Sequence, residues 1–159
     1  MSVEGRLAAL ESRLQAAEDQ LEIIRLLTTY GPAVDSGSSQ AAAALWTEDG
    51  AYDIGGMHRA EGHANIAALY DGEGHQGLIH QGSSHLTATP RITLHGDTAE
   101  AVAYSFVVLK GEKDWGIWRA SANRWKLKRT AAGWRIVERF NRTLNGSEES
   151  HAILRSGAK

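Results

Sequence analysis

The sequence predicts an α+β fold in which helices come first and cover one face of a strongly curved, mostly antiparallel sheet. Two observations support this class. Apolar residues recur at helical spacing in the first part of the chain, and four strand-like runs separated by short turns follow from His85 onward. The 159 residues, 42% hydrophobic and 23% charged, fit one globular domain.

The longest helical pattern lies near the N-terminus, where residues 1–17 form an extension of the domain. We expect its apolar stripe to pack on its own domain rather than to form a zipper between chains, although the early part can cross to a neighbour. Gly31 and Pro32 predict an end near Tyr30, or a kink after which the helix resumes to Asp35. The stripe consists of Leu7, Leu10, Leu14, Ala17, Leu21 and Ile24.

Two shorter helices and a loop are expected before the main sheet. Gln40–Trp46 indicates a second helix, and Gly62–Tyr70 indicates a third. Between them, Ala51–Ile54 is a short strand candidate that ends at a Gly55-Gly56 turn. Residues Asp71–Ser84 are rich in Gly, His and Gln and have no period, which favours a long loop that covers a pocket.

The sheet itself is predicted by the second half of the chain. Its four runs are His85–Leu94, Thr98–Lys110, Ile117–Thr130 and Trp134–Arg142, and the short turns between them favour an antiparallel meander. Residues 147–159 indicate a C-terminal tail, loosely ordered from Gly146 onward.

Simple alternation divides the last of these strands into two faces. The sequence leaves open which face lines the interior. One face carries Trp134, Ile136, Glu138 and Phe140, and the other carries Arg135, Val137, Arg139 and Asn141.

Charge and composition exclude several classes of function. The 17 Lys and Arg and 19 Asp and Glu give a net charge of −2 without a basic run, which argues against a nucleic-acid partner. The chain has no cysteine, so disulfides, thiolate metal sites and thiol nucleophiles are excluded.

The sequence also carries no sign of a membrane, a cofactor or a metal. No stretch has the apolar core of a signal peptide or a membrane span, so we expect a cytoplasmic protein. No nucleotide, flavin or metal motif is present, and His75 and His80 lack a matching carboxylate spacing. We therefore expect no cofactor and no metal.

The order of several short motifs resembles the SnoaL-like branch of the nuclear transport factor two-like superfamily. The resemblance covers roughly residues 18–146 and implies a cone-shaped α+β barrel around one internal pocket for a small molecule. It also implies a homo-oligomer, a trimer or a dimer, formed through the open sheet face. The motifs are Tyr30 with Asp35, Leu45-Trp46-Thr47-Glu48-Asp49-Gly50, Gly62, His85-Leu86-Thr87-Ala88-Thr89-Pro90-Arg91-Ile92, Gly96-Asp97-Thr98-Ala99, and Arg129-Thr130 before Gly133-Trp134-Arg135-Ile136.

Within that superfamily the pattern is most similar to scytalone dehydratase and hexachlorocyclohexane dehydrochlorinase, which implies a catalytic dyad of His85 and Asp35. A histidine, with an unperturbed pKa of about 6.5, suits a general base near neutral pH. A carboxylate on its far ring nitrogen fixes the tautomer and stabilises the imidazolium. Tyr30, as a hydrogen-bond donor to the substrate, completes the catalytic set that the resemblance implies.

A second group of residues is expected to bind the substrate. The resemblance implies that Arg139 stabilises a departing anion and that Asn141 lies beside it. Tyr52, Trp46 and His80 are the other candidates. Each has a structural alternative, such as a half-buried aromatic side chain or an exposed ion-pair partner.

Three functions remain open from the sequence. The first is a cofactor-independent lyase that removes water or another small leaving group from a cyclic or polyketide-like substrate through His85. The second is an isomerase or polyketide cyclase with Asp53 or Asp35 as base, in the manner of ketosteroid isomerase. The third is a non-catalytic binding or association domain. The distance between Asp35 and His85 and the direction of Asp53 discriminate among them.

Overall fold

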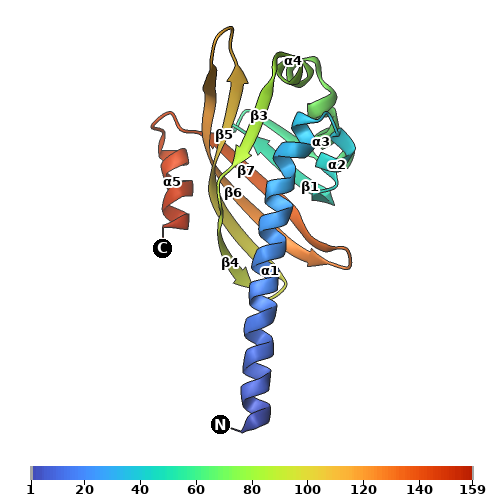
Figure 1. Ribbon diagram of the computed structural model, residues 1–159, viewed down its shortest axis with the longest axis vertical. Coiled ribbons are helices and arrows are strands. Elements are labelled where there is room, and N and C mark those ends of the chain that lie inside the picture. Colours follow the sequence, from blue (N-terminus) through green and yellow to red (C-terminus); the bar gives the residue numbers. More distant parts are fainter. Residues whose placement is uncertain (1, 159) are drawn as a thin grey trace.

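The computed structural model describes residues 2–158 and confirms the α+β class (Figure 1). The helices are α1 (Val3–Asp35), α2 (Ser39–Ala43), α3 (Gly62–Asp71), α4 (Glu73–Gln81) and α5 (Glu148–Gly157). The strands are β1 (Trp46–Ile54), β2 (His58–Glu61), β3 (Ser83–Thr87), β4 (Arg91–His95), β5 (Thr98–Lys110), β6 (Trp115–Thr130) and β7 (Gly133–Thr143).

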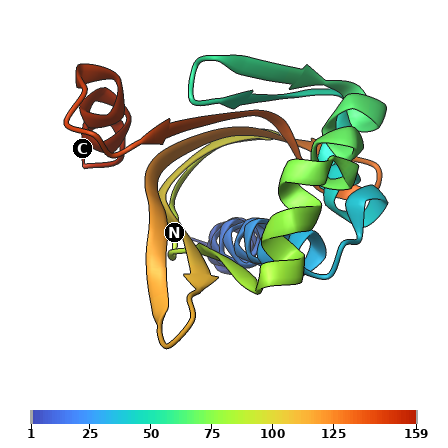
Figure 2. The same ribbon diagram turned by 90° about the horizontal axis from the view of Figure 1, so that it is seen from above.

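The strands form one strongly curved mixed sheet in the order β2-β1-β7-β6-β5-β3, and β4 also pairs with β5. The β1–β7 pairing is parallel and the other pairings are antiparallel. Figure 2 shows the sheet curving around α1, with α3 and α4 near the mouth of the concave side and α5 on the outer side. This curvature directs side chains from distant strands toward one interior.

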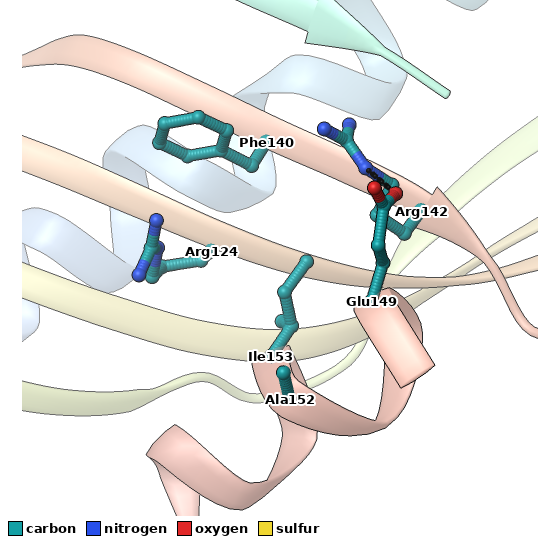
Figure 3. Close-up of a pocket in the computed structure, with 6 residues that line it drawn as sticks. All are labelled: Arg124, Phe140, Arg142, Glu149, Ala152 and Ile153. Atoms are coloured by element: carbon teal, nitrogen blue, oxygen red, sulfur yellow. Dashed lines mark hydrogen bonds and ion pairs between the residues drawn. The ribbon is translucent and has the colours of Figure 1, made fainter. Parts of the chain in front are cut away.

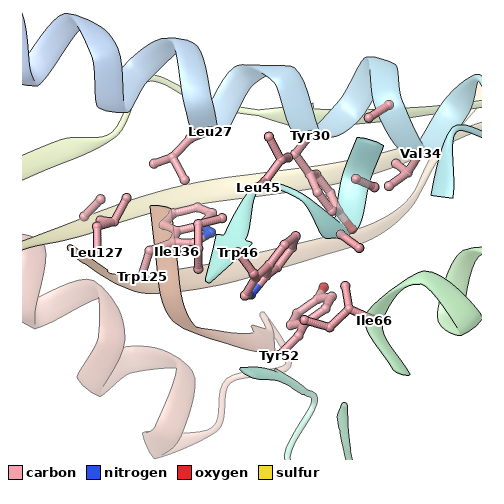
Figure 4. Packing of buried hydrophobic residues seen from close by; sticks show 14 of the residues in the cluster. Leu27, Tyr30, Val34, Leu45, Trp46, Tyr52, Ile66, Trp125, Leu127 and Ile136 are labelled. Atoms are coloured by element: carbon pink, nitrogen blue, oxygen red, sulfur yellow. The ribbon is translucent and has the colours of Figure 1, made fainter. Parts of the chain in front are cut away.

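The C-terminal half of α1 packs inside this curve. Its inward face is apolar, with Ile23, Leu27 and Val34 almost fully buried. Figure 4 shows Leu27 and Val34 among the other side chains of the core. The helix continues through Pro32 to Asp35, which is one of the two outcomes that the sequence left open. Pro32 lacks an N–H, but it is exposed and so is Thr28 four residues earlier, so water can reach the carbonyl left without a partner.

A buried ion pair anchors the middle of α1 to the sheet. Asp19 accepts two hydrogen bonds from the guanidinium of Arg129, each of 2.7 Å, and one from the indole N–H of Trp134 at 3.2 Å. The hydrogen bonds from Arg129 lower the pKa of Asp19 to about 2, although burial opposes this. Because the pKa is depressed, the pair stabilises the fold above the ordinary pKa of 3.8, and this stabilisation is lost as the pH falls through 2.

We expect Asp19→Asn to lower the free energy of unfolding near pH 7 by about 1–3 kcal/mol, because it removes a charge and leaves Arg129 partly unpaired. The difference from the wild type should shrink as the pH falls from 4 towards 2. Urea denaturation at several pH values measures it. Asp97→Asn is the matched control: Asp97 also binds Arg129, but its side chain is 83% exposed, so its loss should cost less than about 0.5 kcal/mol. Equal costs for both variants would contradict the anchoring role.

The expected packing of the N-terminal leucine stripe is wrong. Leu7, Leu10, Leu14 and Leu21 are each more than half exposed, and the face of α1 that contacts the domain is a different one. The helix therefore has two apolar faces, and helical spacing alone does not distinguish which of them meets the sheet. The first turns of α1 extend beyond the end of the sheet (Figure 1).

Two other predictions about the first half of the chain need correction. The second helix is only α2, and Trp46, expected inside that helix, instead begins β1. Residues 71–84, expected to be a loop, contain the short helix α4. The helix was missed because its glycines and the lack of any buried residue leave no apolar period in the sequence. The third helix is confirmed as α3.

The second half of the chain follows the predicted runs more closely. Thr98–Lys110 is confirmed as β5, but the run His85–Leu94 divides into β3 and β4 around Pro90, which lacks a donor for the ladder. The tail from Gly146, expected to be loosely ordered, forms α5 on the outer face of the sheet. Ser147 caps this helix by accepting a hydrogen bond from the N–H of Ser150.

A β-bulge in β7 contradicts the simple alternation expected for this strand. In the pairing with β6, Leu127 lies opposite Ile136 and Lys126 lies opposite Glu138, so Val137 has no partner. Beyond Val137 the alternation is reversed. The inward side chains are therefore Trp134 and Ile136 before the bulge and Arg139 and Asn141 after it, and all four are buried.

Among residues 2–158, no helix is both long enough and apolar enough to span a membrane.

Candidate active site

Asp35 and His85 meet in the structure, as the sequence predicted. Nδ1 of His85 lies 2.6 Å from Oδ1 of Asp35, and the backbone N–H of His85 donates to Oδ2 at 2.7 Å. The hydroxyl of Ser83 also donates to Oδ1, at 2.9 Å. An ionised carboxylate only accepts hydrogen bonds, so Nδ1 carries the proton in this contact, and in the neutral imidazole Nε2 is the nitrogen with the lone pair. Nε2 makes no hydrogen bond within residues 2–158.

The last turn of α1 is shaped to reach β3. Gly31 and Asp35 are four residues apart and so lie on the same face of the helix. A Cβ on Gly31 would overlap the carbonyl oxygen of His85. Glycine therefore permits the close approach of helix and strand that brings the carboxylate of Asp35 to the imidazole.

We expect Gly31→Ala to separate α1 from β3 and to cost about 1–3 kcal/mol of stability through overpacking. The Asp35–His85 hydrogen bond should lengthen or break, which a crystal structure or the NMR signal of the Nδ1 proton would reveal. Gly74→Ala is the control, since a Cβ there meets nothing within 4 Å. A Gly31→Ala protein with an unchanged dyad would contradict this account.

The environment keeps Asp35 ionised. Partial burial acts to raise its pKa, but the hydrogen bonds from the side chain and backbone of His85, with that from Ser83, outweigh it, so the pKa lies below the ordinary value of 3.8. The stabilisation that Asp35 provides is thus present above that value and is lost as the pH falls through the lowered pKa.

Aromatic side chains surround the dyad. The ring of Tyr30 lies edge-on to His85 with 6.3 Å between centroids, and the hydroxyl of Tyr70 donates to that of Tyr30 at 3.4 Å. The ring of His75, on α4, lies 5.4 Å from that of His85. Nε2 of His75 donates to the carbonyl of Val34 at 2.8 Å, which places α4 directly over the dyad.

Arg139 is a buried cation in the same interior. Its residue is only 2% exposed, and no ion pair joins it to a carboxylate in the described part of the chain. Its guanidinium carbon lies 4.3 Å from the ring centroid of Tyr30, 4.6 Å from that of Tyr52 and 5.5 Å from that of Trp125. The faces of these rings are the guanidinium's stabilising partners in place of a carboxylate.

A single amide holds Arg139 and Asn141 together. Oδ1 of Asn123 accepts from Nε of Arg139 at 3.0 Å and from Nδ2 of Asn141 at 2.9 Å. The amide nitrogen of Asn123 donates to the hydroxyl of Ser105 at 2.7 Å. Asn141 therefore lies close to Arg139, as expected, and the two side chains share Asn123 as their hydrogen-bond acceptor.

The interior tyrosines stay protonated near neutral pH. Burial raises the pKa of Tyr52 and of Tyr70, and the nearby charge of Arg139 only partly offsets this. Both phenols are thus hydrogen-bond donors rather than anions.

The structure also brings in residues that sequence reasoning did not select. His85 pairs with Val107 across β3 and β5, and Val107 pairs with Arg119 across β5 and β6, so Arg119 lies in the same row of the inner face. It forms no ion pair with a carboxylate in residues 2–158. Arg119 and Asn123 are four residues apart on β6, so their side chains point to the same face of the sheet. This spacing was visible in the sequence and could have placed Arg119 near the site.

Other predicted residues lie elsewhere or have structural contacts. His80 is exposed on α4 and makes no contact with the dyad among the described residues. Trp46 is fully buried, and its indole N–H donates to the carbonyl of Ala51 at 3.1 Å. Asp53 points away from the interior and forms two hydrogen bonds with Arg142, of 2.8 and 3.0 Å.

None of the five main pockets formed by residues 2–158 is lined by Asp35 or His85. One of about 300 Å³ lies between α5 and the outer face of the sheet (Figure 3), where Arg142 is already paired with Glu149. Another, of about 570 Å³, is lined by Trp46, Thr47, His63 and neighbouring residues. Neither combines a free base with an oriented carboxylate, so the dyad is the stronger site on chemical grounds.

Comparison with known proteins agrees with the fold. The SnoaL-like domain family matches residues 15–140. A crystal structure of an NTF2-like protein with a cystatin-like fold from Novosphingobium aromaticivorans is 44% identical, with a TM-score of 0.91, and the match covers 93% of this chain and 96% of that one. No curated protein matches the sequence.

Two more distant structures come from the same organism. One is named as a candidate aromatic ring hydroxylase; it is 27% identical with a TM-score of 0.63, and the match covers 80% of this chain and 90% of that one. The other is named as a candidate scytalone dehydratase; it is 19% identical with a TM-score of 0.68, over 84% and 87% of the two chains. At that identity the second likeness concerns the fold alone.

Proposed function

Since this chain belongs to the SnoaL-like domain family, we propose that it is a cofactor-independent lyase that acts on a small cyclic or polyketide-like substrate. The observation that carries the proposal is the contact between Asp35 and Nδ1 of His85, which makes Nε2 the nitrogen that accepts a proton in the neutral imidazole. The family alone does not fix the reaction, because related folds carry different chemistry.

In the proposed reaction, Nε2 of His85 removes a proton from a carbon next to a carbonyl group. Asp35 stabilises the imidazolium that forms and keeps its ring in position. The C–H electron pair becomes a carbon–carbon double bond as the leaving hydroxyl departs. That hydroxyl takes up the proton held on Nε2 of His85 and is released as water, so the imidazole returns to its neutral form and the reaction balances without an oxidant or a reductant.

The negative charge that develops on the carbonyl oxygen needs a partner. We assign this role to Arg139 and to the hydroxyls of Tyr30 and Tyr52, because the guanidinium lies against both rings. Donors fixed before the reaction stabilise charge in the transition state more effectively than water, which must reorganise. We assign Asn141 the role of orienting this group through Asn123.

The structure argues against Asp53 as the base of an isomerase, and it restricts Asp35, the other candidate base. Asp53 is paired with Arg142 outside the interior, so it has no access to a substrate near the dyad. Asp35 has both carboxylate oxygens occupied by β3. An isomerase or cyclase would therefore also have to use His85.

A second candidate function is a non-catalytic association domain, and one observation favours it. Tyr30, Tyr52, Tyr70 and Arg139 are all nearly fully buried, so side chains fill much of the interior.

A substrate reaches His85 only if a covering element moves. We assign this movement to α4, which buries no residue and is held by hydrogen bonds from His75, Gln76 and Gln81.

The test is a panel of cyclic β-hydroxy ketones incubated with the protein in D₂O. A lyase removes water, which mass spectrometry detects, and any return of a proton from solvent to the carbon before the hydroxyl departs leaves deuterium on the recovered substrate, which NMR detects. An isomerase shifts a double bond without loss of water. Binding without either change, for every member of the panel, would support the association domain and overturn the lyase.

A further inference from the structure

The exposed leucines of α1 form a second apolar face. Leu7, Leu10, Leu14 and Leu21 are between 53% and 60% exposed although they lie on an ordered helix. At 3.6 residues per turn, this face is roughly opposite the one that packs on the domain. An apolar stripe of this kind on a monomer would be an aggregation liability.

The stripe has the period of a coiled coil. Leu7, Leu14 and Leu21 are seven residues apart and take heptad position a, while Val3, Leu10 and Ala17 take position d. The residues that contact the domain, such as Asp19 and Ile23, fall at positions f and c. Those positions point away from a coiled-coil seam, so a second helix can approach the a/d face without meeting the domain.

The flanking charges select the partner and its direction. Position e carries Glu4, Glu11 and Glu18, and position g carries Arg6 and Arg13. In a parallel pair of identical helices, Arg6 of one copy faces Glu11 of the other, and Arg13 faces Glu18. An antiparallel pair would instead set Glu against Glu and Arg against Arg.

From this pattern we propose that the N-terminal part of α1, residues 3–21, forms a parallel two-stranded coiled coil with a second copy of this chain. The two copies bury the leucine face against each other, and the two domains lie on the outer sides of the pair. This interface is separate from the outer face of the sheet, where α5 already covers part of the surface (Figure 2).

Analytical ultracentrifugation of the full chain tests the seam. Leu14→Lys places a charge at position a, and Ser12→Lys places the same charge at the exposed position f of the same helix. We expect Leu14→Lys to halve the mass of the wild-type assembly, with a rise of about a hundredfold or more in the dissociation constant, and Ser12→Lys to leave it unchanged. Circular dichroism confirms that both variants fold.

Two outcomes overturn the proposal. A wild-type chain that sediments as a monomer at micromolar concentration excludes the coiled coil. Equal masses for Leu14→Lys and Ser12→Lys place any association elsewhere on the molecule.

Cross-linking tests the parallel direction. The chain has no native cysteine, so single cysteines report specific contacts. In a parallel pair the two copies of residue 7 meet, and in an antiparallel pair they lie near opposite ends. We expect Leu7→Cys to form an intermolecular disulfide on mild oxidation and Ser12→Cys to form little. The absence of a disulfide from Leu7→Cys, or equal yields from both variants, overturns the parallel arrangement.

Discussion

His85→Ala is expected to lower kcat/KM by about 10²–10⁴-fold, which is the range that general-base catalysis contributes. The side chain is only 9% exposed, yet it packs beside other aromatic rings rather than in the apolar core around Ile23. The fold should therefore survive its loss. Steady-state kinetics on a substrate found with the D₂O panel measures the effect.

Two further variants separate catalysis from structure at this position. His85→Asn keeps a side-chain N–H close to where Nδ1 binds Asp35, so it preserves the contact but removes the base. We expect the same loss of activity with nearly wild-type stability. His95→Ala, at the exposed end of β4, should change neither. Full activity in His85→Asn would contradict the role of Nε2.

Arg139→Met is expected to separate stability from activity. The guanidinium is buried without a carboxylate partner, so replacing it with an apolar side chain of similar length removes a desolvation cost. We expect the melting temperature to stay the same or to rise by about 2–4 °C. The same change should lower kcat/KM by about 10²–10³-fold, because the developing negative charge loses its main partner.

Arg142→Met is the matched control on the same strand. Arg142 lies on the outer face and pairs with Asp53 and Glu149. Its replacement should lower the melting temperature and leave kcat/KM unchanged, the opposite pattern to Arg139→Met. Calorimetry and kinetics on both variants decide the point. A strongly destabilised Arg139→Met would indicate that the cation supports the fold rather than the reaction.

The sequence predicted the parts of the fold that depend on local pattern. The limits of β5, the start of α3 and the meeting of Asp35 with His85 all follow from spacing or from the family resemblance. These features repeat a simple period or lie in short motifs. The same periodicity identified α1 as a helix but not which of its faces meets the sheet, because both are apolar.

The parts that were missed depend on tertiary contacts. The bulge at Val137 reverses the faces of β7, and no local pattern marks the residue that lacks a partner. His75 contributes through α4, whose glycines hide the helical period. Arg119 and Tyr70 join the site because strand register and helix packing bring distant residues together.

The contact between α1 and β3 also bears on solubility. β3 is the last strand on its side of the sheet, and such a strand offers free backbone groups to other chains. Here the carboxylate of Asp35 accepts a hydrogen bond from the outward-facing N–H of His85. The backbone at Gly31 lies against the carbonyl oxygen of His85. The end of α1 thus occupies the place where a foreign strand would add. Substitutions that move the last turn of α1 away from β3 expose the backbone groups of this edge strand to strands of other chains, which favours aggregation. The same movement separates Asp35 from His85.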